Sequence, residues 1–248
     1  MSFADVLLRV APRGKDEFER LSVAVDLIQR LQARLNGVFV ATNETSDSDH
    51  ARNLFERAVS RTSIETTWRV VDGHSSRALL FQARRSDLAI LPLGAAVGGG
   101  PDCAPELVAL GSGRPVIILP GPANAMSIGH TVLVGWNDSR ESARAVHDAM
   151  PILVAADKVV VLTVMGEDDL EPMADRRLVE HLRQHGVSVE LARRHGEIVE
   201  EIAAEARRVD ADMLVIGLHR MPEGSPTKLG YVSTRLARAV SLPAFVST

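Results

Sequence analysis

Short apolar runs alternate with amphipathic stretches along the second half of the chain. The run 159–165 is almost continuously apolar and rich in valine, as expected for a strand covered on both faces. The stretch 197–209 instead places Ile198, Ile202 and Ala206 four residues apart, which is helical spacing. Strands that alternate with helices predict a parallel sheet with helices on both faces.

The same criteria predict five strands and four helices from residue 129 onward. We expect strands over 131–136, 159–165, 187–192, 213–216 and 244–246, and helices over 139–156, 175–185, 197–209 and 234–240. Pro151 should kink or interrupt the first of these helices. In the first half, the pattern predicts a long helix over about 16–35 and a polar loop over 43–49.

Three segments of the first half recur, in the same order, in the second. They pair residues 4–10 with 130–136, 83–94 with 206–217, and 114–119 with 242–247, so that Gly94 stands beside Gly217. Three collinear matches predict a duplication. The alternative is that the matches reflect only the alternation of strands and helices that all α/β units share. The glycines and proline of 121–129 indicate a linker. We therefore predict one domain over 1–122 and a second over 129–248.

Composition narrows the class of protein. The net charge is −4, which argues against the basic surface that is typical of nucleic-acid-binding proteins. No apolar run approaches the length of a membrane span, and the first residues lack the pattern of a signal peptide. A single cysteine suits a reducing compartment. We predict a cytoplasmic protein without nucleic-acid or membrane partners.

Two loops of the second half are placed for ligand chemistry. In open parallel sheets, ligands lie beyond the carboxyl ends of the strands, where the strand order reverses. One such loop carries Asn137 and Asp138, and the other runs from Gly217 to Thr234, rich in glycine and hydroxyl groups, into a helix. Helix N-termini attract phosphate. Asp138 and Glu141 also match a capping box, which alone would explain both residues and is the favoured interpretation of them.

The second loop resembles the nucleotide motif of universal stress proteins, in which glycine, two residues, glycine, nine residues and glycine precede serine or threonine. Gly217 and Gly230 keep the first and third glycines, and Val232 and Ser233 match the usual continuation. Arg220 replaces the second glycine and Tyr231 the first hydroxyl residue. An arginine at position 220 would either fill the phosphate space or pair with phosphate.

The resemblance implies the adenine nucleotide alpha hydrolase-like fold: two tandem, open, doubly wound parallel five-stranded sheets, each with strand order 3-2-1-4-5. It also implies a stress-response protein that binds ATP or AMP, with Mg, in its second domain. Pairing of the two domains within the chain, or a homodimer, is implied as well. The candidate nucleotide contacts are Asn137, Asp138, Val164, Gly217, Arg220, Gly230, Val232 and Ser233.

A regulatory binding module is favoured over an enzyme, and no catalytic residue or metal ligand is assigned. Two alternatives stay open: a nucleotide-free interaction scaffold, and a weak adenine-nucleotide hydrolase that would use His219, Asp138 or Glu223. The loops 11–14 and 94–103 of the first half lack the spaced glycines, so the first domain is predicted to hold a degenerate site.

Overall fold

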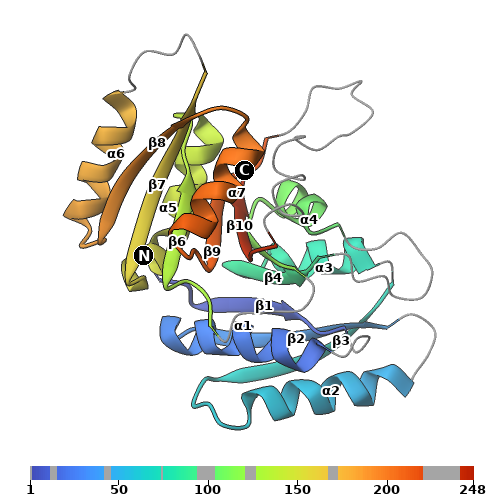
Figure 1. Cartoon of the computed structure of the whole chain (residues 1–248). Coiled ribbons are helices and arrows are strands. Elements are labelled where there is room, and N and C mark those ends of the chain that lie inside the picture. The colour runs from blue at the N-terminus through green and yellow to red at the C-terminus, as the bar shows by residue number, and fades with distance from the viewer. Residues whose placement is uncertain are drawn as a thin grey trace, which may run out of the picture. The chain divides into compact units, whose positions relative to one another are not determined.

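The computed structural model describes residues 2–11, 16–41, 46–73, 75–93, 104–120, 127–166, 173–219 and 241–248. The chain divides into two compact units, Met1–Ser127 and Ile128–Thr248. Within each unit, strands and helices alternate along the chain (Figure 1). Among the described residues, no helix combines the length and the apolar character needed to cross a bilayer.

The first unit is a parallel sheet of five strands. Its elements are β1 (Asp5–Arg9), α1 (Glu17–Leu31), β2 (Arg34–Ala41), α2 (Ser46–Val59), β3 (Thr66–Asp72), α3 (Ser75–Ala83), β4 (Leu88–Pro92), α4 (Pro105–Ser112) and β5 (Val116–Leu119). Parallel pairing gives the order β3-β2-β1-β4-β5. The strands β4 and β5 are buried along their whole length, so the core lies around them.

Two sequence predictions in the first unit are wrong. The helix expected to reach residue 35 ends at Leu31, because Gln32 adopts a left-handed conformation with φ 53° that closes the helix. The loop expected over 43–49 is in part the start of α2, which begins at Ser46. Asp47 and Asp49 lie in the first turn of α2, where carboxylates favour the positive end of the helix dipole.

The second unit repeats this order of elements. It contains β6 (Thr131–Gly135), α5 (Arg140–Ala155), β7 (Lys158–Met165), α6 (Met173–Gln184), β8 (Val189–His195), α7 (Ile198–Arg208), β9 (Met213–Gly217) and β10 (Ala244–Ser247). Its parallel order is β8-β7-β6-β9-β10, so the predicted order 3-2-1-4-5 is confirmed in both units. Pro151 lies inside α5 and does not interrupt it. The helix expected over 234–240 lies outside the described residues.

Helices cover both faces of the second sheet. A Cβ atom built on Gly135 would meet Ile216 and the Ile202 side chain of α7, whereas one built on Gly217 would meet the backbone of α5. Neighbouring positions along a strand point to opposite faces. Because Gly217 follows Ile216 directly, α5 and α7 lie on opposite sides of the sheet.

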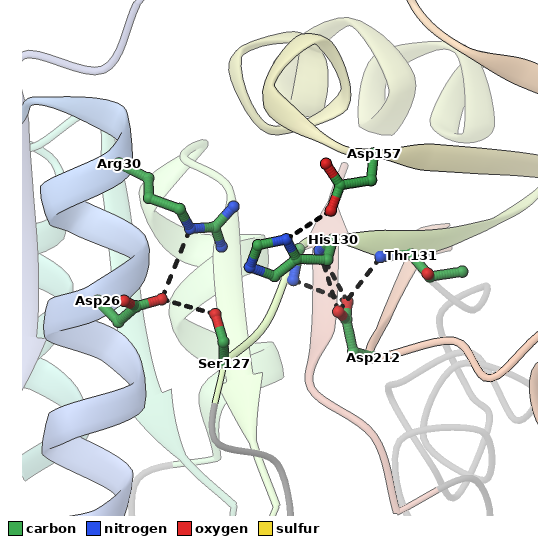
Figure 2. A network of polar contacts seen from close by, with 8 residues as sticks. Asp26, Arg30, Ser127, His130, Thr131, Asp157 and Asp212 are labelled. Atoms are coloured by element: carbon green, nitrogen blue, oxygen red, sulfur yellow. Dashed lines mark hydrogen bonds and ion pairs between the residues drawn. The ribbon is translucent and has the colours of Figure 1, made fainter.

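In each unit, an aspartate just before the fourth strand fixes the start of the first strand. Asp87 accepts hydrogen bonds from the backbone amides of Ala4 and Asp5, at 2.8 and 3.1 Å. Asp212 accepts them from the amides of residues 129–131, at 2.8 to 3.2 Å, and Figure 2 shows its carboxylate facing these groups. Both copies thus close the amino ends of two adjacent strands in the same way.

Candidate functional site

The candidate site of the second unit lies at the carboxyl ends of β6 and β9. These two strands are neighbours, with Val132 opposite Met213 and Val134 opposite Val215. The chain leaves β6 toward β7 on one side, and returns through β9 and β10 on the other. The strand order therefore reverses between β6 and β9, which is where ligands enter sheets of this kind.

The loop after β6 is held by Ser139, not by Asp138. Ser139 is the N-cap of α5, and its side chain accepts from the Ser142 amide while the Ser142 side chain accepts from the Ser139 amide. The prediction that Asp138 caps this helix with Glu141 is wrong. Asp138 has φ 55°, a left-handed conformation that aspartate tolerates, and its side chain is exposed. Its carboxylate is therefore not used by the cap.

The side chain of Asn137 also holds this loop in place. Its side-chain oxygen accepts from the Ser139 hydroxyl at 2.7 Å and lies 3.3 Å from the Ser139 amide. This local turn is a known use of asparagine before a helix. Asn137 thus positions the loop, and Asp138, the next residue, faces solvent at the carboxyl end of β6.

Gly217 ends β9 against the first turn of α5. A Cβ atom at this position would lie 2.5 Å from the carbonyl carbon of Glu141 and from the amide nitrogen of Ser142. Both atoms belong to the backbone and cannot rotate away, so only glycine lets the helix approach this closely. Gly217 therefore brings the N-terminus of α5 to the end of β9.

A side-chain contact links the residues after β9 to the first turn of α5. Nδ1 of His219 lies 3.3 Å from Oε2 of Glu141, and both side chains are partly exposed. Leu218 donates its backbone N–H to the Ser247 carbonyl at 2.7 Å, which ties the start of the second loop to β10. The first residues after β9 thus lie beside the first turn of α5 and the end of β10.

Two buried polar atoms at the same end of the sheet have no hydrogen-bond partner among the described residues: the indole nitrogen of Trp136 and the hydroxyl of Thr163. Trp136 donates its backbone N–H to Leu162 at 2.9 Å, which sets it beside Thr163 in the parallel register. Orphaned polar groups of this kind suit a site that receives a polar ligand. The sequence signal for Thr163 is a hydroxyl within an otherwise apolar strand.

The remaining predicted contacts fall into two groups. Val164 is half-buried in β7 and points to the face opposite Thr163. Arg220, Gly230, Val232 and Ser233 lie outside the described residues, as does Tyr231, so the later part of the glycine pattern stays a prediction. Within the described ranges, no group of three or more His, Cys, Asp or Glu side chains is arranged to hold a metal ion.

The first unit has different residues at the equivalent place. The register sets Pro92, opposite Leu119, where the second unit has Gly217 opposite Ser247. The sequence comparison that paired Gly94 with Gly217 is therefore wrong by two residues. Arg9 ends β1 where Gly135 ends β6.

Comparisons with known proteins agree with this architecture. The model of the universal stress protein family matches residues 165–247. A universal stress protein structure from Archaeoglobus fulgidus aligns over 98% of this chain and 96% of its own, with TM-score 0.73 and 17% identity. A functionally unknown protein from Pseudomonas aeruginosa aligns over 98% and 92%, with TM-score 0.68 and 16% identity. A comparison with curated proteins gives no match.

At these identities, the structural likeness concerns the fold, which is α/β in both units. The family match to the second unit, together with a whole-chain likeness to a universal stress protein, confirms the resemblance to tandem universal stress proteins.

Proposed function

We propose that the second unit binds an adenine nucleotide, ATP or AMP, at the carboxyl ends of β6 and β9, beside the first turn of α5. In this proposal the chain is a cytoplasmic, regulatory stress-response protein, and the nucleotide is its signal. The observation that carries the proposal is the close approach at Gly217, which sets the first turn of α5 beside the end of β9. Support also comes from the family match over residues 165–247.

The groups at this end of the sheet suit a nucleotide. The exposed carboxylate of Asp138 is free to accept hydrogen bonds from ribose hydroxyls, because Ser139 already caps the helix. Trp136 and Thr163 offer buried polar atoms that have no partner in the described part of the chain. The glycine and hydroxyl pattern that ends at Ser233 would supply the phosphate contacts, since backbone N–H groups and hydroxyls bind phosphate oxygens.

The first experiment asks whether nucleotide binds at all. Freshly purified full-length protein is denatured and its retained small molecules are identified by mass spectrometry. The protein is then titrated with ATP and with AMP, each with and without magnesium, by calorimetry. We expect one adenine nucleotide per chain. No retained nucleotide and no binding heat with either ligand would contradict the proposal and favour a nucleotide-free scaffold.

The second experiment locates the site with a matched pair of variants. Asp138 and Asp210 are both exposed aspartates with left-handed φ, at 55° and 52°. Asp210 lies in the turn before β9, at the opposite end of the sheet. We expect Asp138→Ala to weaken binding about tenfold, the loss of roughly 1.4 kcal/mol, and Asp210→Ala to leave it unchanged. Equal affinities for the two variants would place the nucleotide elsewhere.

A further inference from the structure

A small cavity in the first unit lies between the end of β1 and the start of α1. Arg9, Glu17 and Arg20 line it, together with Pro92 and apolar side chains of β1, α1, β4 and β5. All three charged side chains are buried, with residue exposures of 3% for Arg9, 2% for Glu17 and 9% for Arg20. Charged groups this deep in a protein need partners, because water no longer solvates them.

The single carboxylate does not balance the two guanidinium groups. Oε1 of Glu17 accepts from the Ala11 backbone amide at 2.8 Å, and Oε2 pairs with Nη2 of Arg20. No ion pair within 4.0 Å joins Glu17 to Arg9. The cluster therefore carries one positive charge more than its carboxylate neutralises.

Two N–H donors of this cluster have no acceptor among the residues that the structure describes. They are Nη1 of Arg9 and Nε of Arg20, and both atoms are fully buried. A buried donor without a partner costs free energy, and a charged one costs more than a neutral one. Such groups in folded proteins usually meet an ordered water or an ion. The two donors belong to different elements, and both residues line the same cavity.

The size of the cavity restricts its occupant. About 10 Å³ is open to the centre of a water-sized sphere, which is room for one small occupant. The N-terminal turn of α1, a helix of 15 residues, adds positive potential from its dipole.

We propose that this cavity binds one monovalent, halide-sized anion, held by Arg9 and Arg20. The anion accepts the two orphaned N–H groups and neutralises the excess charge. It thereby joins the end of β1 to the second turn of α1. A water molecule would satisfy the donors but would leave the positive charge unbalanced. The site is independent of the nucleotide proposed for the second unit.

A bromide soak of crystals of the unmodified chain tests the site directly. Bromide scatters anomalously, so a bound ion gives a peak between Nη1 of Arg9 and Nε of Arg20. We expect that peak at this position, and its disappearance after back-soaking in gluconate. Density without anomalous signal would show a water there and would overturn the proposal.

A salt titration measures the same ion in solution. The sequence has two tryptophans, so Trp136→Phe leaves Trp68 of β3 as the only tryptophan reporter, and it lies in the first unit. In this full-length background, urea unfolding is followed in chloride and in gluconate at equal ionic strength. At a chloride concentration ten times the dissociation constant, the folding equilibrium constant of the unit should rise about tenfold. Equal midpoints in the two salts would contradict chloride binding.

Two variants in the same background assign the effect to the cluster. Arg9→Met removes one of the two orphaned donors and should abolish the difference between chloride and gluconate. Arg85→Met removes an exposed arginine of the same unit and should leave that difference intact. If Arg9→Met keeps the full chloride dependence, the anion binds outside the cavity. If that variant does not fold, the bromide experiment decides the question with the unmodified chain.

Discussion

The two units are alike at the amino ends of their strands and differ at the carboxyl ends. At the amino ends of the strands, Asp87 and Asp212 both accept hydrogen bonds from backbone amides at the start of the first strand, two amides for Asp87 and three for Asp212. At the carboxyl ends, the first unit places a buried arginine and a proline where the second has two glycines. The scaffold contacts are thus repeated in the second copy, whereas the crevice residues are not.

The difference has a simple physical basis. In the second unit, Gly217 lets α5 approach the sheet, and Asp138 in the loop after β6 is exposed. In the first, the side chains of Arg9, Glu17 and Arg20 fill the equivalent region with paired and unpaired charges. Among the described residues, one copy therefore exposes Asp138 after its first strand, while the other lines a small cavity with buried charged residues.

The largest expected effect comes from Gly217→Ala. The new Cβ atom would lie 2.5 Å from two backbone atoms of α5, so the helix must shift. We expect a loss of about 3 kcal/mol in the stability of the second unit, as for an overpacked core, together with loss of nucleotide affinity. Urea unfolding followed by Trp136 in a Trp68→Phe background measures the stability, and calorimetry measures the affinity.

The control for this substitution is Gly113→Ala in the first unit. A Cβ atom there would meet nothing within 4 Å, so only the strain of φ 68° remains. That strain costs about 1 kcal/mol. A Gly217→Ala variant that loses no more stability than this control would show that the contact with α5 is not tight.

The next largest effect is expected at Asp212 and Asp87, the two aspartates that bind the start of the first strand in each unit. Asp212→Ala leaves the amides of residues 129–131 without their acceptor, and we expect a loss of about 2 kcal/mol. Asp87→Ala removes the acceptor of two amides, one of them exposed, and should cost about 1 kcal/mol. The unfolding of each unit is monitored through the tryptophan of that unit. The reverse order of losses would contradict the roles given to these two side chains.

Acid should act on the two units in opposite directions. Burial raises the pKa of Glu17 above its ordinary 4.5, so the stability that this group contributes is full below 4.5 and is lost as pH rises through the raised pKa. Burial, with the neighbouring His185 and His147, lowers the pKa of His181 below 6.5. The stability contributed by His181 is therefore present above pH 6.5 and is lost as pH falls through the lowered pKa.

Urea unfolding between pH 7 and pH 4.5 tests this opposition. The difference in stability between the unmodified chain and Glu17→Gln should shift in favour of the unmodified chain as pH falls. The difference in stability between the unmodified chain and His181→Gln, measured through Trp136, should shift in favour of the variant as pH falls. Parallel pH profiles for the two comparisons would mean that the environments assigned to these side chains are wrong.

Most strands of the second unit could be predicted from the sequence, because their apolar runs are long and are buried on both faces. The strand expected over 159–165 is β7, at Lys158–Met165. The strand β8 instead continues past the predicted residue 192 to His195. Its last residues include Arg193, which pairs with Asp175 of α6 at 2.7 and 2.9 Å. An ion pair with a residue of another helix cannot be predicted from the local pattern of apolar and polar residues.

The candidate site was less predictable, because its details depend on geometry. Two aspartates, Asp210 and Asp212, stand before β9, and only the hydrogen bonds show that Asp212 is the counterpart of Asp87. Arg9 follows an apolar strand, and the sequence does not distinguish a buried arginine from one whose head reaches water. The strand order itself came from the family resemblance and not from periodicity.

The smallest effect separates capping from ligand binding in the loop after β6. Ser139→Ala removes the N-cap of α5 and should cost about 1 kcal/mol of stability. Asp138→Ala should change stability by less than about 0.5 kcal/mol, because the side chain is exposed and takes no part in the cap. The nucleotide affinities should follow the opposite order, with the larger loss at Asp138. If Asp138→Ala instead destabilised the unit as much as Ser139→Ala, the carboxylate would serve the helix, and its proposed role at the ribose would have no support.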